Sequence, residues 1–119
     1  MELQFQEATT VHIIAYVMRR KPGLSQEEFF KLYAEHGQVM AMAARGLLRY
    51  EQYPLRVAES LGDVYSTGLP EYDALSVYTY ETAEDAEFTS RLNEVIEDSE
   101  RFIDFATMIT LPVNKRTVV

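Results

Sequence analysis

Two histidines, His12 and His36, carry the side chains that change charge closest to neutral pH, so they are the first candidates for proton transfer. His36 lies three residues after Tyr33 and four before Met40, a spacing that places all three on one face of a helix. His12 shares one face of an apolar run with Tyr16. On spacing alone, two interpretations of each histidine stay open. It could be a hydrogen-bonded residue of the core or of an interface, or it could be a general acid–base group.

A second group of polar side chains comes from a tyrosine-rich run between residues 72 and 80. Alternate residues of a strand share a face, and one face of this run carries Tyr72, Ala74, Ser76, Tyr78 and Tyr80. The tyrosine rings make most of this face apolar, and hydroxyl groups lie at the ends of its side chains. Ser76, Tyr78 and Tyr80 could therefore donate hydrogen bonds to a phenol or ketone oxygen of an aromatic ligand. The same face could equally form an ordinary sheet interface, where tyrosines are common.

No spacing typical of a metal or cofactor site occurs in the chain. There are no cysteines, which excludes disulfides, thiolate nucleophiles and cysteine metal sites. The two histidines fit neither the helical zinc motifs nor a facial triad. No glycine-rich phosphate loop or dinucleotide fingerprint is present either. We therefore expect any reaction of this protein to need no cofactor and no metal.

The formal net charge of −8 arises in the second half of the chain. Residues 61–119 carry twelve acidic and four basic side chains, whereas residues 1–60 carry seven of each. An anionic protein repels other polyanions, so neither nucleic acid nor an anionic membrane is an expected partner. The first ten residues lack a secretory signal pattern, and no apolar run approaches the roughly 20 residues that span a bilayer. We therefore expect a cytoplasmic protein.

The helix that would carry His36 has clear start and stop signals. A Lys-Pro-Gly turn at residues 21–23 precedes it. Ser25 then stands three residues before Glu28, which is the spacing of a capping box. The apolar stripe ends shortly before Gly46, a residue suited to the end of a helix. The pattern therefore predicts one long amphipathic helix that ends at residues 44–46.

The strand expected before this helix covers Val11–Met18, a β-branched apolar run. Neither of its faces is polar. In a chain of this size helices can cover one face, whereas the other needs a second subunit or a ligand. The run therefore favours an oligomer.

Four further elements are expected downstream. They are strands over Leu47–Tyr53 and Tyr72–Tyr80, a helix from Ala83 behind the N-cap Thr82, and a last strand over Phe105–Pro112. The second helix should direct apolar side chains to the core and break within residues 97–104. The core-facing residues are expected to be Ala86, Phe88, Leu92, Val95 and Ile96. Arg101 and Asp104 are interpreted as an ion pair that ties this helix to the last strand.

Three segments fall outside this pattern. The stretch 54–71 is longer than usual loops and is interpreted as a loop or lid over a pocket. Residues 1–10 are expected to form a flexible N-terminus. Residues 113–119 are expected to form a C-terminal tail whose apolar end could dock on a partner.

The element order is βαββαβ over one domain, residues 1–119. Two βαβ units in so short a chain predict an α+β ferredoxin-like fold, with a four-stranded antiparallel sheet and both helices on one face. The other face is left bare. Pairing two bare faces would produce a homodimer of the dimeric α+β barrel type.

Three stretches of the chain, taken together and in order, resemble the EthD family. They are VMRRKPGLSQEEFFKLYAEHG, YDALSVYTYET and DSERFIDFATMITLP, which lie within residues 11–112. The first resembles a signature in which a turn and a helix carry a histidine, and this histidine aligns with His36. Many members of the family have a proline after the glycine that follows, whereas this chain has Gly37-Gln38.

The resemblance implies an activity as well as a fold. The wider group includes cofactor-free oxygenases and aromatic polyketide cyclases, and fungal EthD-like proteins are associated with decarboxylation of aromatic carboxylic acids. The expectation is therefore a cofactor-independent decarboxylase of an aromatic polyketide-type acid. An anthrone-type monooxygenase, a polyketide cyclase and a non-catalytic dimer that binds an aromatic ligand are the alternatives.

The expected site follows from this resemblance. His36 would deliver a proton, while Tyr78, Tyr80 or His12 would hold a substrate oxygen. The pocket wall would come from Tyr16, Phe29, Tyr33, Met40 and Ser76. This pocket is expected to open on the sheet face.

Overall fold

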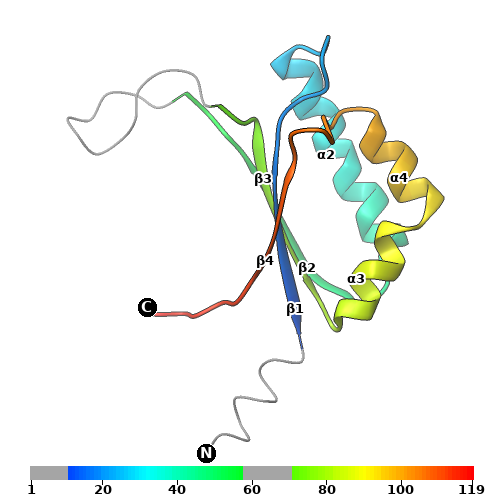
Figure 1. Cartoon of the computed structure of the whole chain (residues 1–119), viewed down its shortest axis with the longest axis vertical. Helices are drawn as coiled ribbons and strands as arrows, with labels where there is room; N and C mark the ends of the chain where they lie inside the picture. Colours follow the sequence, from blue (N-terminus) through cyan, green and yellow to red (C-terminus); the bar gives the residue numbers. More distant parts are fainter. Residues whose placement is uncertain (1–10, 58–70) are drawn as a thin grey trace, which may run out of the picture.

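A computed structural model describes residues 11–57 and 71–119 of the chain. Over these residues helices and strands follow in the order β, α, β, β, α, α, β (Figure 1). The elements are β1 His12–Met18, α2 Gln26–Ala43, β2 Leu47–Pro54, β3 Ala74–Tyr80, α3 Ala83–Ser90, α4 Asn93–Glu100 and β4 Ile109–Val113. The predicted βαββαβ order is confirmed, with the second helix divided in two.

The four strands form one sheet in the order β2-β3-β1-β4, and every neighbouring pair is antiparallel. Helices α2, α3 and α4 all lie on the same face of this sheet (Figure 1). The predicted ferredoxin-like α+β fold is therefore confirmed. Its two central strands, β1 and β3, lie beneath the helices.

Helix α2 begins with the predicted capping box. The Glu28 N–H donates to Ser25 Oγ at 3.1 Å, and the Ser25 N–H donates to Glu28 Oε1 at 2.8 Å. These contacts satisfy two of the N–H groups left free at a helix start. The helix ends in the predicted region, at Ala43, where Ala44 takes extended backbone angles. Gly46 has a left-handed backbone at φ 68° and forms the turn into β2. Its buried face carries Phe29, Tyr33, His36 and Met40.

The core lies between the helices and the sheet in two clusters. The first joins α2 to the end of α4 and to the sheet through Met18, Phe29, Tyr33, Ala74, Phe102 and Ile103. The second joins Met40, Tyr78, Tyr80 and Val95. Both clusters contain aromatic rings, and they lie at the two ends of the layer in which α2 packs on the sheet.

The second helix breaks earlier than predicted. Leu92 has extended backbone angles (φ −69°, ψ 133°), so α3 stops at Ser90 and α4 starts at Asn93. Leu92 packs against the Tyr78–Tyr80 cluster, which explains why the chain turns there. The prediction that Phe88 faces the core is wrong, since its side chain is 42% exposed at the surface. Ile96 is 38% exposed but lies on the inner side, where it lines a cavity between the helices and the sheet.

Phe88 packs instead against the guanidinium of Arg45, whose carbon lies 3.9 Å from the ring centroid. This cation–π contact covers one face of the ring at the protein surface. An apolar residue in the right helical spacing is therefore held outside the core by a long basic side chain.

The last strand starts later than predicted, at Ile109 instead of Phe105. The Asp104 carboxylate accepts hydrogen bonds from the Ala106 N–H at 3.2 Å and from Thr107 Oγ1 at 2.9 Å. These bonds hold a turn where the strand was expected. The predicted ion pair between Asp104 and Arg101 is also wrong, because Arg101 pairs with Asp98 and Glu35.

The sheet face opposite the helices is mainly aliphatic over β1, β3 and β4, whereas β2 at its edge carries Arg49, Glu51 and Tyr53. The alternate positions of β1, β3 and β4 that point away from the helices include Ala15, Val17, Leu75, Val77, Ile109, Leu111 and Val113. The β4 residues among them are 37% to 44% exposed. No described residue forms a helix over this face (Figure 1).

The other predicted segments are only partly described. Residues 58–70 of the predicted lid and the predicted flexible N-terminus, residues 1–10, lie outside the described residues. After β4, residues 114–119 are exposed and have no regular structure. Within the described ranges, no helix has the length and apolarity needed to cross a membrane.

Candidate active site

A cavity of about 340 Å³ lies between the three helices and the sheet face that they cover. The predicted pocket on the sheet face is therefore on the covered side and not on the bare one. Seven of the predicted site residues line this cavity: Tyr16, Tyr33, His36, Met40, Ser76, Tyr78 and Tyr80. Helix α2 and strands β1 and β3 supply them, so rigid elements position this part of the lining.

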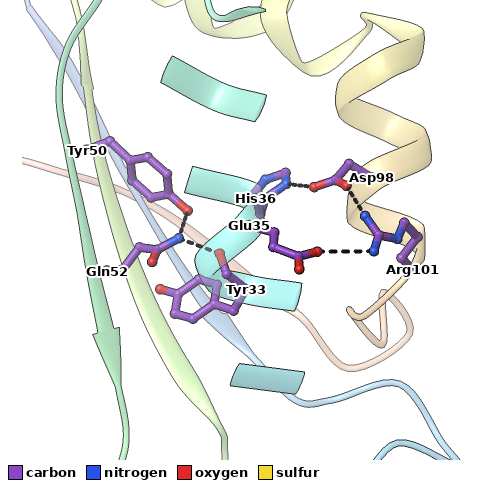
Figure 2. A network of polar contacts seen from close by, with 7 residues as sticks. All are labelled: Tyr33, Glu35, His36, Tyr50, Gln52, Asp98 and Arg101. Atoms are coloured by element: carbon purple, nitrogen blue, oxygen red, sulfur yellow. Dashed lines mark hydrogen bonds and ion pairs between the residues drawn. The ribbon is translucent and has the colours of Figure 1, made fainter. Parts of the chain in front are cut away.

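His36 forms the main polar contact of the cavity with a residue that the sequence analysis did not select. Its Nδ1 lies 2.7 Å from Oδ2 of Asp98 on α4, and both side chains are buried (Figure 2). A carboxylate only accepts hydrogen bonds, so Nδ1 carries the hydrogen and Nε2 of the neutral ring is left as an acceptor. The pair is a histidine–carboxylate dyad whose second ring nitrogen is a hydrogen-bond acceptor.

Burial lowers the pKa of His36, and the hydrogen bond and charge of Asp98 partly oppose this effect. The balance keeps the pKa below its usual value of about 6.5, so the imidazole is neutral at pH 7. The ring also packs edge-on against Phe102 with 5.2 Å between centroids. His36 is therefore a fixed, neutral base.

Arg101 holds the other oxygen of Asp98. Its Nη1 lies 2.7 Å from Asp98 Oδ1, and its Nη2 lies 3.4 Å from Oε1 of Glu35, the residue before His36 (Figure 2). Arg101 is half-exposed and does not line the cavity. A chain of polar contacts thus joins the buried dyad to the surface.

Tyr33 and Ser76 form a second polar pair. The Tyr33 hydroxyl donates to the Leu75 carbonyl oxygen at 3.0 Å and lies 2.7 Å from Ser76 Oγ. The Gln52 amide donates to the Tyr33 carbonyl oxygen and to the Tyr50 hydroxyl, which ties α2 to β2 (Figure 2). Since these groups bind one another, Tyr33 and Ser76 fix the shape of the lining.

The remaining tyrosines form a layer of rings. Tyr78 stacks on Tyr50 with centroids 4.1 Å apart and on Tyr80 at 6.0 Å, while Tyr16 meets Tyr78 edge-on at 5.5 Å. Burial is the main cause that raises the pKa of Tyr16, Tyr78 and Tyr80. Their hydroxyls are therefore neutral at pH 7 and can donate hydrogen bonds.

Two predicted site residues do not line the cavity. Phe29 is fully buried in the core, where it packs against Phe102 at 5.5 Å between centroids. His12 begins β1 opposite Tyr80 and is also absent from the lining. Neither side chain is brought to His36 by the described part of the fold.

Asp98 was missed although the sequence carries a signal for it. It lies three residues after Val95, and both face the core from α4, so a carboxylate stands on the buried side of a helix. Buried carboxylates need partners, and His36 is the partner that the fold supplies. No three His, Cys, Asp or Glu side chains of the described residues lie close enough together to hold a metal ion.

The fold and the dyad define a ferredoxin-like α+β protein with a buried acid–base group in an aromatic cavity. The model of the EthD domain matches residues 21–106, and the chain belongs to this family. No curated protein matches the sequence.

Solved structures of other proteins share the fold at low sequence identity. A hydroxynitrile lyase from Passiflora edulis is 13% identical over 91% of this chain and 97% of its own, with a TM-score of 0.60. SnoaB, a cofactor-independent oxygenase from Streptomyces nogalater, is 12% identical over 92% of this chain and 95% of its own, with a TM-score of 0.57. A dimeric protein of unknown function from Bacteroides fragilis is 8% identical over 90% of this chain and 98% of its own, also with a TM-score of 0.57.

Proposed function

We propose that this protein is a cofactor-independent decarboxylase of a small aromatic polyketide-type carboxylic acid. The observation that supports this proposal best is the pairing of a neutral His36 with the Asp98 carboxylate beside a cavity walled by tyrosines and apolar side chains. Loss of carbon dioxide from such an acid requires a proton at carbon and a hydrogen bond to an oxygen that gains charge. The dyad and the tyrosine hydroxyls are groups of these two kinds.

This reaction requires a histidine that first accepts one proton and then returns it, so His36 must start neutral. The acid enters with its own proton, and His36 Nε2 takes that proton to form an imidazolium beside a carboxylate. In the keto tautomer of the acid, the bond to the carboxyl carbon breaks and carbon dioxide leaves, and the electron pair forms an enolate between the former carboxyl-bearing carbon and the ketone oxygen. The imidazolium returns the proton to this carbon, so His36 ends neutral as it began.

The cavity lining favours the movement of negative charge from the carboxylate to the ketone or phenol oxygen in this step. The charged side chains among the described lining residues are Glu100, which is exposed, and His36 when protonated. A carboxylate is weakly solvated in such surroundings, whereas carbon dioxide is neutral. Tyr78 and Tyr80 would donate to the phenol or ketone oxygen that carries the transient negative charge.

A cofactor-free oxygenase is the second candidate, and the free Nε2 acceptor favours it. A neutral base can remove a proton from an acidic phenol or anthrone carbon without first receiving one. The resulting anion would reduce dioxygen directly. A cyclase would use the same base on a ketone, without gain of oxygen or loss of carbon.

The bare aliphatic face supports a homodimer. Its apolar side chains lie on strands that have no cover among the described residues, and burying such surface is favourable. The Bacteroides fragilis structure, which has the same fold, is described as dimeric. The dimer would leave the cavity on the other side of the sheet.

The test is incubation with a panel of hydroxylated aromatic acids and their decarboxylated counterparts, with products read by mass. Decarboxylation predicts products lighter by one carbon dioxide from the acids and no reaction of the counterparts. Products that gain oxygen, with oxygen uptake, would replace the decarboxylase by the oxygenase. Tight binding with no conversion of any compound would overturn both enzymes in favour of a binding protein.

The pH dependence of kcat/KM distinguishes the proposed decarboxylase from the proposed oxygenase without a measurement of product mass. For the decarboxylase, the aromatic acid and His36 must share one proton. Since an aromatic carboxylic acid is ionised near neutral pH, kcat/KM should fall as pH rises above the His36 pKa, where neither group carries that proton. For the oxygenase, kcat/KM should rise to a plateau over the same range, because the free base is the active form.

A further inference from the structure

Arg101 lies outside the cavity yet binds the carboxylate that holds His36 (Figure 2). Its guanidinium joins two acidic side chains from different helices, Asp98 of α4 and Glu35 of α2. We propose that Arg101 is a positioning residue of this site, which fixes the orientation and balances the charge of Asp98 and so controls the protonation of His36. This inference rests on His36 being the acid–base group of the proposed function.

The geometry divides the two oxygens of Asp98 between two partners. Oδ2 accepts from His36 Nδ1 at 2.7 Å, and Oδ1 accepts from Arg101 Nη1 at 2.7 Å. Two short charge-assisted bonds leave the carboxylate little freedom to rotate. Because Oδ2 stays in place, Nδ1 keeps the hydrogen and Nε2 stays free for the substrate.

Arg101 also fixes the helix that carries His36. Its Nη2 contacts Glu35 at 3.4 Å, and Glu35 is the neighbour of His36 on α2. The guanidinium therefore bridges the two helices that supply the dyad. An ordinary surface ion pair would contribute little, but this one is continuous with a buried charge.

The charges around His36 determine whether a substitution in this network raises or lowers the His36 pKa. Negative groups are Glu35 on α2 and Asp98 and Glu100 on α4, and Arg101 is the positive group of this network. The remaining titratable groups that line the cavity are tyrosines, namely Tyr33 of α2, Tyr16 of β1, and Tyr78 and Tyr80 of β3. Burial raises the pKa of each tyrosine, so they carry no charge in the range where histidine titrates.

Two substitutions should therefore move the His36 pKa in opposite directions. Arg101→Gln removes the positive charge beside Asp98, so the imidazolium is stabilised and the pKa should rise by on the order of one pH unit. Asp98→Asn removes the negative charge and should lower the pKa further. Arg101→Lys keeps the charge and should return the pKa to within about a third of a unit of the wild-type value.

The measurement is a proton NMR titration of the histidine ring, which needs no substrate. The chain has only two histidines, so a His12→Gln background leaves His36 as the single histidine signal. Arg91→Gln is the matched control, because Arg91 pairs with Glu87 on α3 at 3.4 Å and lies at the surface. This control should leave the His36 titration unchanged, and circular dichroism should report folded protein for each variant.

Equal His36 pKa values in the wild type and Arg101→Gln would overturn the inference, and so would shifts of the same sign in the Arg101 and Asp98 variants. If Arg101→Gln does not fold, Glu35→Gln tests the same network, because removal of this negative charge should lower the His36 pKa. Opposite shifts without turnover of any aromatic acid would leave the inference standing and reject the proposed function. Turnover of an aromatic acid without those pKa shifts would support the proposed function and reject the inference about Arg101.

Discussion

The two faces of the sheet come from the same strands but carry different chemistry. Toward the helices, β1 and β3 present Tyr16, Tyr78 and Tyr80, whose rings pack against one another and line a cavity. Toward the opposite side they present Val17, Val77 and other mainly aliphatic residues, with Thr79 as the hydroxyl-bearing exception. Large aromatic rings leave irregular space with hydroxyl groups at its edge, whereas short branched side chains form an even surface. This difference is the basis of the two proposals, a small-molecule site on the covered face and a second subunit on the bare one.

The largest effect is expected from His36→Ala on the cavity side. Turnover of the aromatic acid should fall about 100- to 10,000-fold, the range for loss of a general acid–base group. The oligomeric state should not change, because His36 lies on the covered side. Steady-state kinetics and size measurements check both points. Lys31→Ala, on the exposed side of the same helix, is the control and should keep full turnover.

A charge on the bare face should separate the subunits. Leu111→Asp places a carboxylate where β4 would meet the partner, and burial of an unpaired charge costs several kcal/mol. The dimer dissociation constant should rise at least about 100-fold, as measured by sedimentation or light scattering over a dilution series. Thr110→Asp puts the same charge on the neighbouring residue, which points to the other face. Equal dissociation in both variants, or a monomeric wild type, would contradict the assignment of this face.

A smaller effect is expected from Tyr78→Phe, which removes one hydroxyl from the cavity and keeps the ring. The ring stack with Tyr50 should persist, so the free energy of unfolding should change by less than about 1.5 kcal/mol. Turnover should fall about tenfold if the hydroxyl binds a charged oxygen in the reaction. Urea unfolding and kinetics on the same preparation separate these two effects. Unchanged turnover would assign Tyr78 to packing alone.

The fold was predictable where local signals agree with tertiary packing. Helix α2 has a capping box at Ser25 and Glu28 and a left-handed Gly46 after its end, and the structure confirms these features. The alternation of Ser76, Tyr78 and Tyr80 correctly placed them on one face of β3. These properties depend on neighbours within a few residues, which the sequence displays directly.

Other features depend on contacts between distant residues. The break at Leu92 has no side-chain cap, so no local pattern indicated it. The exposure of Phe88 depends on Arg45, more than forty positions earlier in the chain. The partner of Arg101 could not be chosen from spacing, because Asp98 and Asp104 both lie three residues from it. In the structure Asp98 lies within α4, one turn before Arg101, whereas the Asp104 carboxylate is bound by Ala106 and Thr107 in the turn that follows.

The two members of the dyad are 62 positions apart in the chain. Helix α2 can form by itself without creating the site, because Asp98 arrives only when α4 docks against it. A contact between such distant residues carries a large loop-closure entropy and is expected to form late in folding. The titration of His36 is therefore a reporter of completed tertiary assembly. A folding intermediate with native helices but undocked α4 would show the ionisation of an ordinary solvated histidine.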